Sequence, residues 1–356
     1  MSPKPRPRAT PRNVAIVGGG MAGVACARTL DRAGATVTLF EREASCGGRT
    51  ASRDTPFGRF DTGAQYFTVR DARFAKALET VPGLCRPWSA NAVRVLDPLG
   101  RVVEAARPGG TPHWVARPGM DALVQAWAEP LSQSGRTALG LTVTRIEPDP
   151  LAPGRWQLRT EAADGAVHVH AGFDAVLLAL PAPQARRLLA AVPGAPAASL
   201  AQAMSAVSMA PCWTLMLAYP NAAQPGLPHL GPQWNAARST HHRLAWLARE
   251  SSKPGRGPVE RWTAQANAGW SQEHRSDTPE RVGAKLLKAF AEVTGIRATP
   301  AHTDWTFWPY ARTEQPLGQT HLWDAAAGLG ACGDWCIGHR LEDAFVSGLS
   351  LALDLA

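Results

Sequence analysis

The sequence predicts an α/β fold in which a domain built on a parallel sheet is interleaved with a second, α+β domain. Three observations predict it: a strand, helix and strand pattern near the start, two buried-strand candidates much farther along, and hairpin and helix patterns between them. The 356 residues suffice for one large or two intimately joined domains, at roughly 150 residues each. We therefore expect spatial order to differ from sequence order.

The first expected unit covers residues 13–40. Residues 14–17 (VAIV) are a short apolar run, which is typical of a fully buried parallel strand. The Ala-rich stretch 23–33 has apolar side chains at helical spacing, and Gly34 is placed to end that helix. Residues 36–40 (TVTLF) follow as a second strand, so the unit is a βαβ motif of ordinary length.

Later segments complete the expected fold. AVLLAL at 175–180 and LGAC at 329–332 are buried-strand candidates for the same sheet, and an amphipathic helix is expected at 341–353. The patterns between them predict hairpins at 93–105 and 156–170, strands of a second sheet at 212–219, 244–249 and 261–267, and helices at 120–131 and 280–293.

These elements predict the domain boundaries. We assign residues 13–84, 118–184 and 320–356 to the domain with the parallel sheet, and residues 85–117 and 185–319 to the second domain. Residues 1–12 (MSPKPRPRATPR) hold four basic side chains, no acidic ones and several prolines, so we expect a disordered basic arm.

Composition narrows the class of protein. The 37 Lys and Arg against 29 Asp and Glu give a net charge of +8, and because part of this excess lies in the arm, no nucleic-acid partner is expected. No apolar run approaches the roughly 20 residues of a membrane span, so we expect no membrane association and a cytoplasmic protein. The six cysteines are too scattered for a disulfide framework, and His168 and His170 lack a nearby third ligand, so no metal site is expected.

A glycine motif, GGGMAG at 18–23, lies between the first strand and its helix. In such a motif the first glycine permits a tight turn, the second lets the backbone approach a pyrophosphate, and the third lets helix and strand pack closely. The phosphates then meet the free N–H groups of the helix N-terminus. The candidate cofactor-binding residues here are Gly18, Gly20, Met21, Ala22 and Gly23.

An acidic residue near the end of the second strand is needed to hold a ribose, and Glu41 directly follows that strand. Glu41 and the adjacent Arg42 are therefore further candidate cofactor-binding residues. Strand, glycine motif, helix and acid together predict dinucleotide binding. A second GxGxxG spacing at 328–333 is discarded, because its glycines straddle a strand instead of following it.

Further motifs resemble a known family. GGR at 47–49, FDTGAQYF at 60–67, ACGDW at 331–335 and RLEDAFVSG at 340–348 are similar to segments of FAD-containing flavoproteins of the amine oxidase superfamily. The resemblance implies a Rossmann-type FAD-binding domain in an amine-oxidase or p-hydroxybenzoate-hydroxylase-like architecture. It also implies non-covalent FAD, because no cysteine stands where covalently flavinylated relatives have one.

The resemblance also implies roles for single residues. Asp334 would meet the ribityl and pyrophosphate part of FAD, the backbone of Val143 would contact adenine, and the helix that starts near Glu342 would point at the pyrimidine edge of the flavin. The candidate cofactor-binding residues on this ground are Gly48, Arg49, Ala64, Gln65, Val143, Gly333, Asp334, Glu342, Asp343 and Ala344.

Within the superfamily the sequence is most similar to renalase and its bacterial relatives, also through RPGMDAL at 117–123 and LPAPQ at 180–184. The resemblance implies an oxidase that takes a hydride from a small planar reduced substrate, an isomeric dihydro-NAD(P), to flavin N5 and then reduces O2 to H2O2. No catalytic residue is assigned, because a dihydropyridine becomes aromatic when it loses hydride. The alternatives are an amine oxidase or desaturase of the superfamily and a non-enzymatic, redox-responsive FAD-binding scaffold.

Aromatic residues are the candidates for the substrate pocket. The resemblance places Gln65 and Tyr66 near the flavin ring. In TDWTFWPYAR at 303–312, flat rings could sandwich a planar substrate and the arginine could meet an anionic group, although the tryptophans could equally be ordinary core residues. The pocket candidates are Gln65, Tyr66, Trp305, Trp308, Tyr310 and Arg312.

Overall fold

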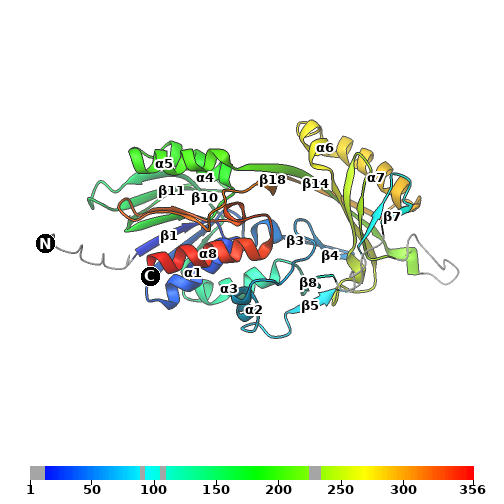
Figure 1. The fold of residues 1–356 in the computed structure, drawn as a ribbon, viewed down its shortest axis with the longest axis horizontal. Coiled ribbons are helices and arrows are strands. Elements are labelled where there is room, and N and C mark those ends of the chain that lie inside the picture. Colours follow the sequence, from blue (N-terminus) through cyan, green and yellow to red (C-terminus); the bar gives the residue numbers. More distant parts are fainter. Residues whose placement is uncertain (1–12, 89–92, 105–109, 224–233) are drawn as a thin grey trace.

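The computed structural model describes residues 13–88, 93–104, 110–223 and 234–356. It has two units, each built on its own sheet, and long strands that run from one to the other (Figure 1). The expected basic arm at 1–12 lies outside the described residues. In the described ranges, no helix combines the length and the apolar character that a membrane span requires.

The first unit contains a six-stranded sheet of order β19-β20-β13-β1-β2-β9, in which only β19 is antiparallel to its neighbour. The central strand β1 pairs with β2 and with β13, so Val14 lies between Val37 and Ala175. This confirms that the distant segments join one sheet. The strands are β1 (Asn13–Val17), β2 (Thr36–Glu41), β9 (Thr137–Leu139), β13 (Ala175–Leu178), β19 (Leu322–Asp324) and β20 (Leu329–Ala331).

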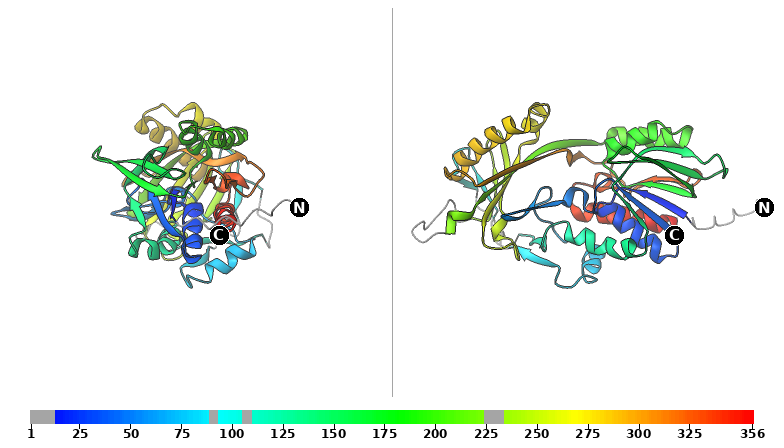
Figure 2. Two further views of the ribbon diagram at one scale, coloured as in Figure 1. Left: turned by 90° about the vertical axis from the view of Figure 1, so that its left-hand side faces the viewer. Right: turned by 180° about the vertical axis from the view of Figure 1, so that it is seen from behind.

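Alternate residues of β1 face two different layers. Val14 and Ile16 are buried against three helices, and Ala15 and Val17 are buried against a small sheet and two further helices. Figure 2 shows the two layers on opposite sides of the sheet. The first layer is α1 (Met21–Arg32), α3 (Ala122–Gln133) and α8 (Leu341–Leu355). The second is β10 (Leu141–Pro148), β11 (Trp156–Ala162), β12 (Val167–Phe173), α4 (Ala182–Ala190) and α5 (Ala195–Ala203).

The position of α4 and α5 differs from the expected division, which assigned residues from 185 onward to the second domain. Ala185, Leu189, Ala197 and Leu200 are buried in the core that covers the six-stranded sheet. Apolar helices after a strand give no indication of which sheet they cover, so the sequence could not place them. After α5, the chain enters the second unit at β14, which starts at Ser208.

The second unit is a seven-stranded sheet of order β18-β14-β17-β16-β15-β6-β7. One face is covered by α6 (Ala268–Glu273) and α7 (Pro279–Thr294) over a core that includes Leu215, Leu217 and Leu286. The other face turns toward the first unit. The expected hairpin and strands are confirmed as parts of this sheet: β6 (Arg94–Leu96), β7 (Val102–Glu104), β14 (Ser208–Tyr219), β16 (Leu244–Arg249) and β17 (Glu260–Ala266). Two further strands of the sheet were not predicted: β15 (Ala236–Ser239) and β18 (His302–Gln315).

A hairpin of the first unit reaches the second sheet. Arg53 contacts Asp304 and Thr306 on β18, and Arg261 on β17 donates to the carbonyl oxygen of Phe57 at 2.6 Å. The hairpin therefore fixes one unit against the other. It is formed by β3 (Ser52–Thr55) and β4 (Gly58–Asp61), and α2 (Ala72–Leu78), β5 (Cys85–Trp88) and β8 (His113–Ala116) follow it.

Candidate functional site

The glycine motif forms the turn between β1 and α1. Gly18 has φ +111°, which glycine adopts without strain, and Gly20 is the N-cap residue of α1. No side chain of the described residues caps this helix, whose first residues Met21 and Ala22 are buried. Free N–H groups at a buried helix start are well suited to bind phosphate. A Cβ on Gly23 would lie 1.9 Å from the carbonyl oxygen of Gly18, so helix and turn pack closely.

A second glycine pair faces this turn. The N–H of Gly47 donates to the carbonyl oxygen of Gly19 at 2.9 Å, and a Cβ on Gly48 would lie 3.1 Å from the Cα of Gly20. The two segments thus oppose each other with backbone alone, beside the start of α1. This cradle has the shape and the donors that a pyrophosphate requires, so the residues present fit a dinucleotide.

The acid at the end of β2 lies beside the same turn. Glu41 is only 7% exposed, and its carboxylate accepts hydrogen bonds from the N–H groups of Gly19 at 2.7 Å and Glu43 at 3.0 Å. Val143 on β10 is buried in the core that also includes Phe40, one residue before Glu41. Arg42, by contrast, is more than half exposed and pairs with Glu43, so its side chain points to the surface.

An ion pair joins the two ends of the chain at this site. The guanidinium of Arg49 donates to both carboxylate oxygens of Asp334, at 2.5 and 3.0 Å, and Asp334 also accepts from the hydroxyl of Thr313. Gly333 is held by a hydrogen bond from its N–H to Ser347 of α8. Planar two-point contacts of this kind fix orientation as well as charge. The GGR and ACGDW motifs are therefore in direct contact, although they lie near opposite ends of the chain.

The two acidic side chains at the start of α8 are both engaged within the protein. Glu342 is buried and accepts from the hydroxyl of Thr68 and from the N–H groups of Arg70 and Asp71. Asp343 accepts from the N–H of Arg340 and so caps the helix. A cofactor would therefore meet the backbone of the first turn, which includes Ala344, rather than these carboxylates.

The segment 61–65 connects the cofactor motifs with the second unit. The N–H of Ala64 donates to the carbonyl oxygen of Arg49 at 2.9 Å. From the second unit, the Trp308 indole donates to the carbonyl oxygen of Thr62 at 2.8 Å, and the Gln265 amide donates to that of Gly63 at 2.7 Å.

The remaining pocket candidates on β18 do not gather beside this segment. Trp305 packs on the opposite face of the sheet, against Gly283 of α7, because side chains three positions apart on a strand point to opposite faces. The hydroxyl of Tyr310 accepts from Arg187 of α4. Arg312 is exposed. The pKa of His339 is lowered mainly by burial and, to a smaller extent, by the positive charge of Arg312. Of the four candidates on this strand, Trp308 contacts the 61–65 segment.

Tyr66 instead has two aromatic neighbours that no sequence motif singles out. The rings of His113 on β8 and Trp246 on β16 lie 4.1 and 5.4 Å from the Tyr66 ring, and all three side chains are half-buried. The indole nitrogen of Trp246 is buried and has no hydrogen-bond partner within the described part of the chain. We call Tyr66, His113 and Trp246 the aromatic trio. Only the fold brings these distant residues together.

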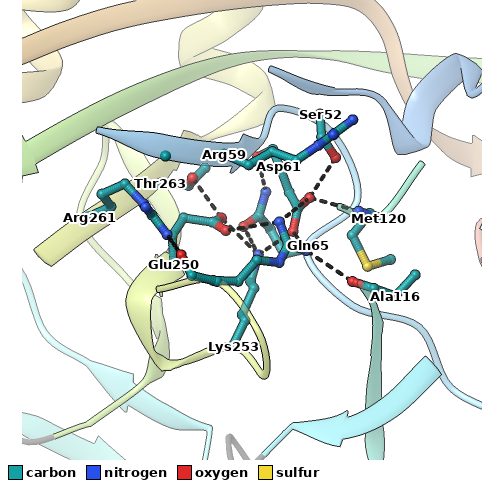
Figure 3. A network of polar contacts seen from close by, with 12 residues as sticks. Ser52, Arg59, Asp61, Gln65, Ala116, Met120, Glu250, Lys253, Arg261 and Thr263 are labelled. Carbon is teal, nitrogen blue, oxygen red and sulfur yellow. Dashed lines mark hydrogen bonds and ion pairs between the residues drawn. The ribbon is translucent and has the colours of Figure 1, made fainter. Parts of the chain in front are cut away.

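Four buried charges lie beside Gln65, and we call Asp61, Glu250, Lys253 and Arg256 the buried ion cluster (Figure 3). Burial alone would raise the pKa of Asp61, but Lys253 and Arg256 outweigh it and lower that pKa to about 2. Burial raises the pKa of Glu250, against the opposing effect of Lys253. This cluster could not be predicted from the sequence, because ESSKPGRG at 250–257 resembles an exposed turn.

Comparison with known proteins identifies the family. Residues 16–79 match the model of an NAD(P)-binding Rossmann-like domain, and residues 99–355 match that of flavin containing amine oxidoreductase. The glutamate synthase [NADPH] small chain of two Mycobacterium tuberculosis strains is 52% identical over 48 residues, which is 14% of this chain. That match spans about a tenth of the length of these curated relatives.

Solved structures share the fold over nearly the whole chain. A putative protoporphyrinogen oxidase from Exiguobacterium sp. 255-15 is 15% identical, with a TM-score of 0.74, over 96% of this chain and 98% of that one. Cyclohexylamine oxidase from Brevibacterium oxydans IH-35A is 14% identical, with a TM-score of 0.71, over 97% and 98%. The predicted Rossmann-type and amine-oxidase-like architecture is thereby confirmed. The chain belongs to the flavin containing amine oxidoreductase family, and it is an FAD-dependent oxidoreductase.

Proposed function

We propose that the protein is a renalase-like oxidase that takes a hydride from a small planar reduced substrate, an isomeric dihydro-NAD(P), and passes the electrons to O2 to give H2O2. FAD supplies the hydride acceptor and the reaction with O2. The proposed cofactor-binding residues are those of the glycine turn, Glu41, Arg49 and Asp334, with the backbone of 64–65 and of the first turn of α8. The second unit would supply the wall of the substrate pocket that faces the cofactor-binding residues.

The aromatic trio is the observation that supports this substrate class best. Tyr66 directly follows the segment that the cofactor motifs hold, and its ring lies 4.1 Å from His113 and 5.4 Å from Trp246. Flat, half-buried rings stack favourably on a planar pyridine. The buried indole N–H of Trp246 offers a donor to the carboxamide oxygen of a nicotinamide. These residues would orient the ring and exclude water, and no side-chain base is required.

An amine oxidase is the main alternative. An amine carries a positive charge at neutral pH, and a site for it gains from a carboxylate that is not already neutralised. In the buried ion cluster, Asp61 and Glu250 are already paired with Lys253 and Arg256. The cluster therefore offers no unpaired carboxylate to an alkylammonium group.

Anaerobic reduction of the FAD-loaded protein tests the proposal. We expect 2- or 6-dihydronicotinamide dinucleotides to bleach the flavin absorbance, and primary amines and apolar hydrocarbons to leave it unchanged. Trp246→Phe keeps an aromatic ring, although a smaller one, and removes the N–H, so it should raise the substrate dissociation constant about threefold to tenfold with little effect on the limiting rate of reduction. Bleaching by an amine, or by none of the dihydronicotinamides, would overturn the proposal. Deletion of residues 1–12 should leave turnover intact, whereas a scaffold that acts through this arm would lose its partner.

A further inference from the structure

The buried ion cluster lies where the two units meet. Asp61 ends β4 of the first unit, whereas Glu250, Lys253 and Arg256 belong to the turn between β16 and β17 of the second. All four side chains are fully buried. Asp61 accepts from Lys253 at 2.8 Å and from both terminal nitrogens of Arg256 at 2.7 and 3.1 Å.

Lys253 reaches beyond the ion pairs. Its ammonium donates to Glu250 at 2.7 Å and, with its third proton, to the side-chain oxygen of Gln65 at 3.0 Å (Figure 3). The amide nitrogen of Gln65 in turn donates to the carbonyl oxygens of Asp61 at 2.6 Å and Gly63 at 3.1 Å. An ammonium has three donors, and here each has a different acceptor. The Gln65 side chain is thus held from the second unit while it holds the backbone of its own segment.

That backbone leads directly to the cofactor motifs. A Cβ on Gly63 would lie 2.0 Å from the carbonyl oxygen of Arg49, so Gly63 leaves no room for the two segments to shift against each other. Ala64 donates to the same carbonyl oxygen, and the Arg49 side chain pairs with Asp334. A continuous series of short contacts therefore runs from Lys253 through Gln65 to Arg49.

The contact of the buried ion cluster with Gln65 is not required to join the two units, because the carboxylates of the cluster have other hydrogen-bond partners. Asp61 already accepts from Ser52 and Met120 as well as from Arg256, and Glu250 accepts from Thr263. Buried ion pairs by themselves contribute little net stability, because desolvation offsets their attraction. The specific feature of this cluster is thus the contact of Lys253 with Gln65.

We infer that Lys253 is a positioning residue for the FAD site: it fixes Gln65, and through Gln65 it holds the 61–65 segment against Arg49. The second unit thereby sets the geometry of the cofactor site in the first. The inference rests on the FAD-dependent family of the chain and is independent of the proposed substrate.

A double-mutant cycle on FAD binding tests this inference. The variants are Lys253→Met, Gln65→Leu and the double variant, each measured for its FAD dissociation constant and for the visible circular dichroism of the bound flavin. Lys253→Met should raise the dissociation constant about tenfold and alter the dichroism, and in the Gln65→Leu background it should add less than about twofold, because coupled residues are not additive. Neither measurement needs a substrate, so failure here is distinct from failure of the proposed oxidase activity.

Controls separate positioning from stability. Glu260→Gln removes one charge of another ion pair of the same sheet, the pair of Glu260 with Arg249. Glu260 also accepts from Ser251 and Trp262, and none of these contacts involves the 61–65 segment. Glu260→Gln should lower the melting temperature without changing the flavin dichroism. If Lys253→Met does not fold, Lys253→Met with Glu250→Leu removes one charge of each sign and keeps the pair of Asp61 with Arg256. Unchanged FAD binding in these Lys253 variants, or fully multiplicative effects with Gln65→Leu, would overturn the inference.

Discussion

Replacing Gly20 with Ala separates the role of the glycine turn in folding from its role in binding FAD. The nearest heavy atom to a Cβ on Gly20 is the Cα of Gly48 at 3.9 Å, which is ordinary van der Waals contact. The φ of −80° and ψ of −175° at Gly20 are open to any residue. The apoprotein should therefore lose less than about 1 kcal/mol in its free energy of unfolding.

FAD binding should respond quite differently. The new methyl group would lie in the cradle between Gly20 and Gly48, where the backbone must come close to a pyrophosphate. We expect the FAD dissociation constant to rise about tenfold to a hundredfold, which is roughly 1.4 to 2.8 kcal/mol of binding free energy. Titration of the apoprotein with FAD, monitored by flavin absorbance, measures the dissociation constant. Urea unfolding of the apoprotein measures its stability.

Gly23→Ala is the matched control, because its Cβ would lie 1.9 Å from the carbonyl oxygen of Gly18. The backbone must shift to relieve this clash, so the variant should lose about 1 to 3 kcal/mol of stability even without FAD. The reasoning is refuted if Gly20→Ala binds FAD as tightly as the unmodified protein, or if both variants unfold alike.

Three further predictions concern other parts of the structure. The pKa of Asp61 is lowered to about 2 from an ordinary 3.8, so the ionised Asp61 carboxylate stabilises the folded protein fully above about pH 4. This stabilisation is lost as the pH falls toward 2. Asp61→Asn should therefore flatten the dependence of the unfolding free energy on pH in this window. Trp308→Phe removes the hydrogen bond to Thr62 and should cost about 1 kcal/mol in urea unfolding, and no loss would show that this contact is not stabilising. Burial raises the pKa values of Cys46 and Cys336 to about 12, so a thiol reagent at pH 8 should label neither in the folded protein and both in urea; rapid labelling before unfolding would contradict their burial.

The elements that the sequence predicted well are those with a local signal. The βαβ unit, the later strands at 175–178 and 329–331 and the helix at 341–355 follow from apolar periodicity, and the structure confirms them within a few residues. The motifs proposed to bind the cofactor are likewise local, so Arg49 and Asp334 could be selected although they are 285 positions apart in the chain.

Contacts between distant strands could not be predicted in the same way. Trp305 and Trp308 look equivalent in the sequence, but the pleat of β18 turns Trp305 toward α7 and Trp308 toward Thr62. His113 and Trp246 meet Tyr66 only because β8 and β16 approach the same segment. Lys253 is similar: a lysine in a turn rich in proline and glycine is usually exposed, and only tertiary structure buries it.

The most direct measurement of the proposed activity is a single stopped-flow record at the visible flavin band. The FAD-loaded protein is mixed without oxygen with one equivalent of 6-dihydronicotinamide dinucleotide, and air is admitted after the absorbance has settled. We predict loss of the band, formation of one equivalent of the oxidised dinucleotide, and return of the band in air with one equivalent of H2O2. An absorbance that never falls, or a band that stays bleached in air, would contradict the assignment as an oxidase of reduced nicotinamides.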